Sequence, residues 1–231
     1  MIDRVLEHLV TLVAADTSDP PSTVRREHPA IAYCVQVLEA FGCDVMVEDL
    51  GGGCVNVRAL RGKPGECGVL FNCHLDTVRA DPGWRRNPFA VAVEGGRAYG
   101  LGSCDIKGAA ACLLSAAETT DQPLAVLLTT DEEGGKGRCI EHFLKTRGFD
   151  PAIVVVAEPT RCAAVAQHRG FASFEVTFRG HAGHSSDTDA ASGSATHAAI
   201  RWAQEALRLA EDGLADSRFN IGIIEGGTAS N

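Results

Sequence analysis

The sequence predicts an α/β fold in which a mostly parallel sheet is flanked by helices, followed by a smaller α+β domain. Three short runs, residues 68–72, 124–130 and 153–157, are apolar throughout and bounded by turn residues. Strands that are apolar on both faces are typical of a parallel sheet covered on each side by helices. Helical stretches at residues 106–119 and 137–147 alternate with these runs, as β-α-β units require.

The residues before the first apolar run predict two helices and two strands. Apolar residues recur at helical spacing in the first 13 residues and again in residues 31–41. A loop with two prolines, residues 16–22, separates these helices because proline interrupts a helix. Strands are predicted around residues 45–47 and 55–57, on either side of three consecutive glycines.

The last third of the chain has a different pattern, which predicts a second domain. Residues 172–178 alternate like a half-exposed strand, residues 190–210 predict a helix, and residues 219–224 predict another strand. We therefore predict one domain over residues 1–167 and a smaller one over residues 168–231. The second domain contains too few elements to be finished, and we expect the chain to be a fragment.

Composition limits the classes of protein to which the chain can belong. A net charge of -9 offers no basic stripe for phosphates, so we expect no nucleic-acid partner. No apolar run approaches the ~20 residues of a membrane helix, and the first residues lack the pattern of a signal peptide. We expect no membrane partner. The nine cysteines include no Cys-x-x-Cys pair, which favours reduced thiols and a cytoplasmic location.

Side chains that can bind metals follow each of the three apolar runs. His74 and Asp76 come after the first run, Glu132 and Glu133 after the second, and Glu158 after the third. Ligand sites in open α/β sheets lie beyond the carboxyl ends of the strands. We therefore expect these side chains to meet in one crevice.

Asp105 adds a further carboxylate, because it directly precedes the Ala-rich helix at a position typical of an N-cap. Clustered carboxylates repel one another unless a cation is present, and imidazole and carboxylate are ligands that zinc accepts. Each residue alone also fits an ordinary loop, a helix cap or a solvated acidic turn. Their joint placement predicts a divalent metal site.

Two other kinds of site are disfavoured by the same segments. The glycines at positions 100 and 102 suggest a dinucleotide fingerprint, but Asp105 stands where a third glycine is needed. Its carboxylate would repel a pyrophosphate. The sequence contains no Gly-x-Ser-x-Gly motif, which argues against a serine hydrolase.

The chain resembles the zinc amidohydrolase family of acetylornithine deacetylase, succinyl-diaminopimelate desuccinylase and the aminoacylases. The matching segments follow the family order and are residues 72–78, 98–108, 130–133, 157–160 and 183–187. The Gly-Leu-Gly-Ser-Cys-Asp, Glu-Pro-Thr and Gly-His-Ser-Ser stretches are most similar to the branch that cleaves acetylornithine and acetylcitrulline. The resemblance implies a metallopeptidase-like catalytic domain and a lid domain through which two chains form a homodimer.

The resemblance also implies a role for each candidate metal ligand. His74 and Glu158 would hold one ion, Glu133 would belong to the second, and Asp105 would bridge both. The ions would be Zn²⁺ or Co²⁺. Asp76 would orient the His74 ring, as carboxylates beside metal-binding histidines do.

Four residues are implied in catalysis and substrate binding. Glu132 would be the general base that takes a proton from the attacking water and returns it to the leaving amine. His184 would stabilise the oxyanion from across a dimer interface. Asn231 and Arg169 match positions that contact the substrate.

The implied reaction is hydrolysis of the N-acyl amide of an N-acetyl amino acid, using a water that two metal ions activate. The small-molecule substrate would be N-acetylornithine or N-acetylcitrulline, in arginine biosynthesis. A dipeptidase or carboxypeptidase on the same scaffold is an alternative, and so is a non-catalytic binding module that has lost the second metal. The family's second ion takes a further His for which this sequence offers no match. We therefore expect at most one well-held metal and weak or absent activity in this chain.

Overall fold

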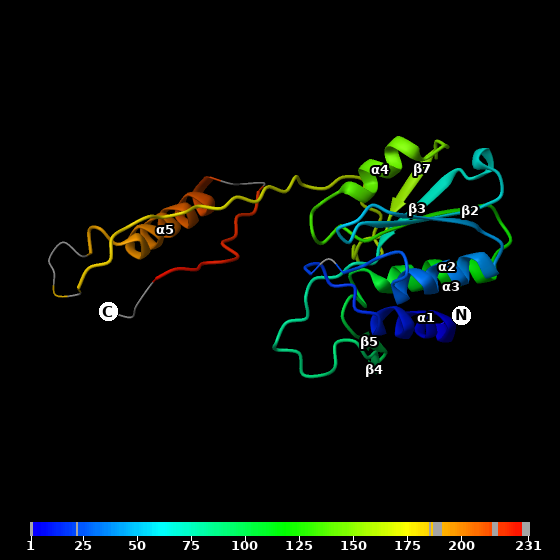
Figure 1. Ribbon diagram of the computed structural model, residues 1–231, viewed down its shortest axis with the longest axis horizontal. Coiled ribbons are helices and arrows are strands. Elements are labelled where there is room, and N and C mark those ends of the chain that lie inside the picture. The colour runs from blue at the N-terminus through cyan, green and yellow to red at the C-terminus, as the bar shows by residue number, and fades with distance from the viewer. Residues whose placement is uncertain (1, 22, 185, 187–190, 214–216, 228–231) are drawn as a thin grey trace. The chain divides into compact units, whose positions relative to one another are not determined.

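The computed structural model describes residues 2–21, 23–184, 186, 191–213 and 217–227 (Figure 1). The chain divides into two units, Met1–Ala163 and Ala164–Asn231. The division lies close to the boundary that the sequence predicts at residue 167. The assignment of the two units as a catalytic domain and a lid domain stays a prediction.

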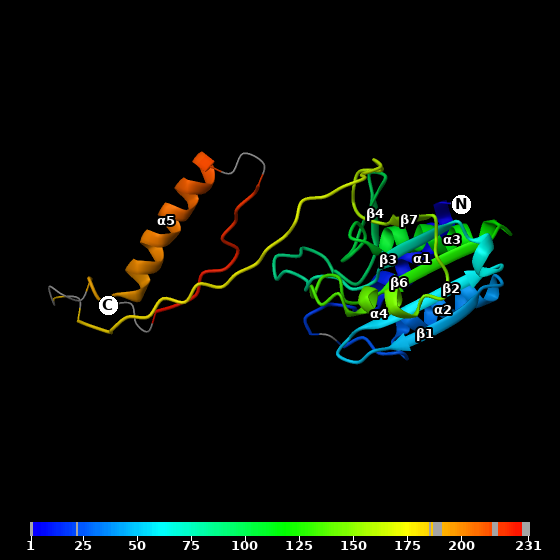
Figure 2. The same cartoon turned by 90° about the horizontal axis from the view of Figure 1, so that it is seen from above.

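The three apolar runs form neighbouring parallel strands in the first unit. β3 (Val69–His74) lies between β6 (Leu124–Thr129) and β7 (Ile153–Val156), and it pairs in parallel with both. Figure 2 shows the strands side by side, with β7 at one edge of the sheet. The carboxyl ends of these three strands therefore face the same way, as the sequence predicts.

The two pairings of β2 are antiparallel, so the sheet is a mixed one in which β2 alone runs against the other four strands, in agreement with the predicted mostly parallel sheet. β1 (Asp44–Asp49) pairs with β2 (Val55–Arg61), and β2 pairs with β6, both antiparallel, giving the order β1-β2-β6-β3-β7. A short turn can join two strands only when they run in opposite directions. The turn here contains Gly51, Gly52 and Gly53, all with positive φ, a conformation that glycine adopts readily.

Helices cover both faces of this sheet. Figure 1 shows α1 (Ile2–Ala14), α2 (Pro29–Ala40) and α3 (Lys107–Thr119) on one face, and α4 (Arg138–Thr146) on the other. Every residue of β6 is buried, and the alternation of its side chains explains why. Val126 and Leu128 pack into the core cluster that the first three helices share, whereas Leu127 packs with Phe143 of α4.

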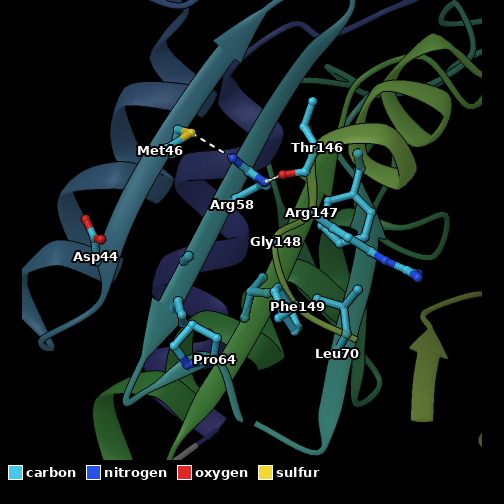
Figure 3. A pocket seen from close by; sticks show the side chains of 13 residues that line it. Asp44, Met46, Arg58, Pro64, Leu70, Thr146, Arg147, Gly148 and Phe149 are labelled. Carbon is cyan, nitrogen blue, oxygen red and sulfur yellow. Dashed lines mark hydrogen bonds between the residues drawn. The ribbon is translucent and has the colours of Figure 1, made fainter. Parts of the chain in front are cut away.

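The face covered by α4 contains a hollow of about 250 Å³ (Figure 3). It lies between β2, β1 and the end of α4. Arg58 of β2 crosses it and donates to the Thr146 carbonyl at 3.0 Å, and it also pairs with Glu48 at 3.2 Å. No residue that the sequence predicts for the functional site lines this hollow.

Two elements of the first unit differ from the sequence prediction. Residues 153–157 predict a buried strand, but the side chains of β7 are 42–58% exposed, because β7 lies at the sheet edge and pairs only with β3. A small antiparallel hairpin of β4 (Ala92–Glu94) and β5 (Arg97–Tyr99) was also not predicted from the sequence. Gly95 and Gly96 form its turn with positive φ, which two-residue hairpins favour. A single 3₁₀ turn, Pro64–Glu66, completes the described elements of this unit.

The described part of the second unit contains one helix, α5 (Ala195–Gly213), close to the predicted range. The strands predicted at residues 172–178 and 219–224 do not form there, although Phe174 and Phe219 stack with ring centroids 6.3 Å apart. An alternating pattern predicts which way side chains point, whereas a strand also needs a hydrogen-bonded neighbour. None of the helices described in either unit is long and apolar enough to cross a membrane.

Candidate functional site

The pairing of β3 with β7 places His74 beside Glu158. Asn72 lies opposite Val156 in the register, and the Ala157 N–H extends the ladder by donating to the Asn72 carbonyl at 2.8 Å. His74 and Glu158 each stand two residues further along the chain from this register pair. Because side chains alternate between the two faces of a sheet, this register brings both to the same face.

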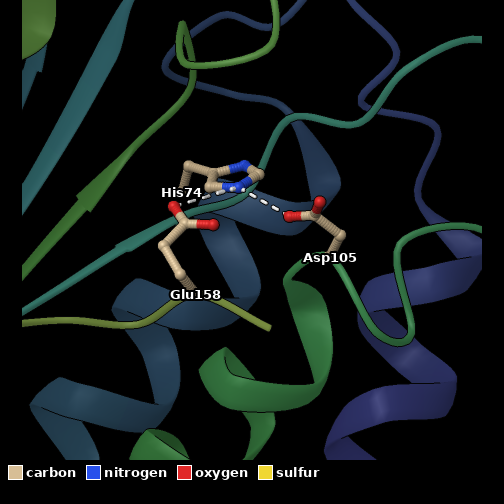
Figure 4. Close-up of side chains that lie close together, drawn as sticks. All are labelled: His74, Asp105 and Glu158. Atoms are coloured by element: carbon tan, nitrogen blue, oxygen red, sulfur yellow. Dashed lines mark hydrogen bonds and ion pairs between the residues drawn. The ribbon is translucent and has the colours of Figure 1, made fainter. Parts of the chain in front are cut away.

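Asp105 joins this pair from the start of α3. The His74 Nε2 atom lies 3.1 Å from Asp105 Oδ1 and 4.0 Å from Glu158 Oε1, as Figure 4 shows. One potential ligand atom from each of the three residues lies within 4.8 Å of the other two. We call His74, Asp105 and Glu158 the His74 cluster.

The prediction that Asp105 caps the helix is wrong by one residue. α3 begins at Lys107, and its N-cap is Ile106, which makes no side-chain hydrogen bond to the helix. The Asp105 side chain is half-exposed and faces the His74 ring instead. Its carboxylate is therefore available to bind a cation.

The hydrogen bonds of His74 show which ring nitrogen carries the hydrogen. Nδ1 lies 3.0 Å from the Asp76 backbone carbonyl, which can only accept, so Nδ1 is the donor. In a neutral ring Nε2 then presents a lone pair toward the carboxylates of Asp105 and Glu158. Acceptors facing one another in this way require either a proton or a metal ion between them.

Asp76 connects His74 to the acidic residues after β6. Its side chain is fully buried, with Oδ1 3.5 Å from His74 Nδ1, and its Oδ2 accepts a hydrogen bond from the Glu133 N–H at 2.8 Å. Burial lowers the pKa of His74, but the hydrogen bonds and charge of Asp76, with Glu132, outweigh it and raise the pKa to about 9. The ring lies in a strongly negative environment, and the role of Asp76 in orienting it stays a prediction.

The carboxylates of the site also respond to one another. Burial raises the pKa of Glu133, and the nearby charges of Asp105 and Glu132 add to this effect. Burial likewise raises the pKa of Glu158, against the favourable charge of His74. Burial is the larger cause of both shifts, and the neighbouring carboxylates Asp105 and Glu132 add to it in each case. A divalent cation would relieve this crowding of negative charge.

The donor atoms fit a divalent metal. One imidazole nitrogen and two carboxylate oxygens converge, and these ligands suit Zn²⁺ and its neighbours in the first transition row. The ligand atoms of the His74 cluster therefore suit a divalent cation, the kind of ligand that the sequence predicts. Glu133 is not part of this cluster of ligand atoms, and its role as a ligand of a second ion stays a prediction.

A cavity of about 530 Å³ adjoins the cluster on the face covered by α4. His74, Glu132 and Glu158 supply part of its polar lining, and apolar side chains of β6, β7 and α4 supply much of the rest. A volume of this size accommodates a small organic molecule. Glu132 thus shares a cavity with two of the potential ligands.

The second unit contains three further candidate residues, of which His184 and Arg169 lie among the described residues. His184 is exposed, and its Nδ1 lies 2.8 Å from Ser186 Oγ. Arg169 is exposed in a segment without regular structure. Asn231 lies outside the described residues. The roles of all three stay predictions.

Lys107, which is fully buried two residues after Asp105, was not among the residues predicted from the sequence. Its Nζ donates to the Ala15 carbonyl at 2.9 Å, so it ties the start of α3 to the end of α1. Burial lowers the pKa of Lys107 to about 8. Lys107 could have been found from the sequence, because it follows Asp105 and Ile106 within residues 98–108, one of the segments that carry the family resemblance.

Comparisons with known proteins agree with this chemistry. The sequence profile of peptidase family M20/M25/M40 matches residues 70–225. An N-acetyl-L-citrulline deacetylase of Xanthomonas campestris pv. campestris is 42% identical over 238 aligned positions, covering 100% of this chain and 63% of the relative. An acetylornithine deacetylase of Myxococcus xanthus is 34% identical, covering 96% of this chain and 62% of the relative. The chain therefore spans less than two thirds of either protein.

Solved structures share the fold over about two thirds of the chain. Human carnosine dipeptidase 1 matches with a TM-score of 0.56 at 21% identity, covering 67% of this chain and 38% of that protein. The carboxypeptidase Sso-CP2 from Sulfolobus solfataricus matches with a TM-score of 0.55 at 19% identity, covering 66% of this chain and 36% of that protein. At these identities the match supports the fold and says nothing about the substrate.

Proposed function

Because the chain belongs to peptidase family M20/M25/M40, we propose that the protein hydrolyses the N-acyl amide bond of an N-acetyl amino acid. The observation that carries the proposal is the convergence of the His74 cluster at one end of the sheet, next to a cavity that Glu132 also lines. Similarity to the deacetylases of Xanthomonas campestris and Myxococcus xanthus favours N-acetylcitrulline or N-acetylornithine as the substrate.

His74, Asp105 and Glu158 would hold a divalent metal ion, Zn²⁺ or Co²⁺. Such an ion, when bound, lowers the pKa of water and polarises an amide carbonyl. Glu133 and Asp105 would contribute to a second ion. The buried Asp76 would keep the His74 ring in the tautomer that directs its Nε2 lone pair toward the ion.

Glu132 would act as the general base and acid of the reaction. It is exposed at the cavity that His74 and Glu158 also line, so its carboxylate can meet both water and substrate. It would take a proton from water as that water attacks the carbonyl carbon. It would then give the proton to the nitrogen of the leaving amine.

The remaining roles rest on similarity to the family. His184 would stabilise the oxyanion from the partner chain of a homodimer, and Arg169 and Asn231 would contact the substrate. The reaction would belong to arginine biosynthesis in the cytoplasm. The high similarity to an acetylcitrulline-cleaving relative, 42% identity along the whole chain, is the support for these assignments.

The test is a comparison of substrates with the full-length protein loaded with Zn²⁺ or Co²⁺. We expect acetate release from N-acetylcitrulline or N-acetylornithine, and faster turnover of these compounds than of dipeptides. Glu132→Gln should lower kcat by a factor of about 100 or more and leave the metal content unchanged. Glu141→Gln, at an exposed position of α4, is the matched control. Preferential cleavage of dipeptides would instead identify a peptidase.

A further inference from the structure

The loop that carries Glu132 and Glu133 is closed by two backbone hydrogen bonds of its own, which do not attach it to the rest of the site: the Gly135 N–H donates to the Glu132 carbonyl at 2.8 Å and the Lys136 N–H to the Asp131 carbonyl at 3.3 Å. We call residues 131–137, between β6 and α4, the acidic loop. It contains Gly134, Gly135 and Gly137, and glycine permits many backbone conformations. A general base and a metal ligand must be held closely to work. Contacts from outside the loop must therefore hold it.

The beginning of the acidic loop is held by contacts within the site and across the loop. The Glu133 N–H donates to Asp76 Oδ2 at 2.8 Å. Asp131 is buried, and its Oδ2 accepts the Cys139 N–H at 3.0 Å. These bonds attach the two flanks of Glu132 to their surroundings, whereas the backbone bonds of Gly135 and Lys136 stay within the loop.

Lys136 supplies those contacts by connecting three segments that are distant in the sequence. Its Nζ donates to Asp19 Oδ2 at 2.6 Å and to the Gly52 carbonyl at 3.2 Å. Asp19 belongs to the loop between α1 and α2, and Gly52 belongs to the turn between β1 and β2. The Lys136 ammonium therefore joins the acidic loop to two other loops of the first unit.

Asp19 is itself held firmly next to the site. Its side chain is 5% exposed, and its N–H donates to the Thr77 carbonyl at 2.9 Å, directly after Asp76. The carboxylate also packs against Gly134, where an added Cβ would lie 2.6 Å from Asp19 Oδ2. Asp19 thus contacts the acidic loop immediately after Glu133 and again at Lys136.

We propose that Asp19 and Lys136 form a positioning pair that holds Glu132 and Glu133 against the His74 cluster. The inference rests on the hydrolase function proposed above for the catalytic consequence, but the placement of the loop can be measured without turnover. The pair is partly buried, with the Lys136 side chain 30% exposed. Removing the cation would leave a buried carboxylate beside Gly134, and the loop would move to let water reach it.

The experiment replaces Lys136 with methionine in the full chain, which keeps the length of the side chain and removes the charge. The first readout is hydrogen exchange of the Glu133 amide, which Asp76 protects in the structure. We expect exchange there to become about tenfold faster or more, while β3 and β6 stay protected. The second readout is turnover of the metal-loaded protein. We expect kcat to fall about 10- to 100-fold, with a smaller change in KM.

Three variants sharpen the result. Lys136→Arg should keep most of the kcat, because it preserves the charge opposite Asp19. Asp19→Asn combined with Lys136→Met should lower kcat and speed Glu133 exchange no more than either change alone. Lys145→Met, which breaks the exposed pair with Glu141 on α4, is the matched control and should leave Glu133 exchange and kcat unchanged.

Several outcomes would overturn the proposal. One is unchanged Glu133 exchange in Lys136→Met, and another is a uniform rise in exchange across β3 and β6, which would show general destabilisation. A wild-type protein that turns over neither N-acetyl amino acids nor dipeptides would defeat the proposed function instead. In that case the exchange measurement would still show whether Asp19 and Lys136 hold the acidic loop in place.

Discussion

The most informative single residue is His74, because its neighbours place opposite requirements on its two ring nitrogens. The Asp76 carbonyl takes the Nδ1 hydrogen, and the carboxylates of Asp105 and Glu158 face Nε2. The ring can satisfy both sides only with a cation or a second proton. The sequence identifies these residues as candidates, but only the distances show that they share one ring.

Lys107 allows a prediction of pH dependence at the residue scale. Burial lowers its pKa from the ordinary 10.5 to about 8 in the folded protein, so the unfolded chain binds more protons between these values. The free energy of unfolding contributed by Lys107 therefore rises as the pH increases from about 8 to 10.5. Below about pH 8 this contribution is absent, because the amine is protonated in both states.

The measurement compares the wild type with Lys107→Met by urea unfolding across this pH range. The difference in unfolding free energy should shift in favour of the wild type as the pH rises. Taking the difference between the two proteins cancels the titration of tyrosine and cysteine. A pH-independent difference would contradict a lowered Lys107 pKa in the folded state.

At the scale of elements, β6 shows how sequence pattern and packing are related. Its uninterrupted apolar run predicts burial on both faces, and the two faces pack against different helices. We expect Leu128→Ala to lower the free energy of unfolding by about 2–5 kcal/mol, because it opens a cavity in the larger core cluster. Leu144→Ala, at a side chain of α4 that is 57% exposed, should change it by less than about 0.5 kcal/mol. Urea unfolding of both variants tests this, and equal losses would contradict it.

The same pattern shows where prediction from sequence ends. The parallel runs, the four helices of the first unit and the segments that carry the site could be predicted, because apolar periodicity and turn residues are local signals. The antiparallel pairings of β2, the exposure of β7 and the missing strands at residues 172–178 and 219–224 could not. Each depends on which segment lies next to which, and a local pattern does not encode that. For the same reason, the contacts of Lys107 and Lys136 could not be predicted from the sequence.

At the scale of the whole molecule, a cation bound among the crowded carboxylates would raise the stability of the fold. A ligand that binds only the folded state stabilises it by mass action. We expect free Zn²⁺ at about 100 times its Kd to raise the free energy of unfolding by about 2.7 kcal/mol, and dialysis against a chelator to remove this gain. Thermal unfolding with and without Zn²⁺ measures it. Glu158→Gln should lose most of the gain, and an equal gain in that variant would place the ion elsewhere.

The parallel register of β3 and β7 has a consequence for how this protein can change over evolutionary time. His74 and Glu158 meet because each stands two residues past the paired residues Asn72 and Val156. Inserting or deleting one residue in either strand would turn one of the two side chains to the opposite face. Gaps in an alignment of working homologues should therefore avoid these strands, even where the amino acids between the two ends vary freely.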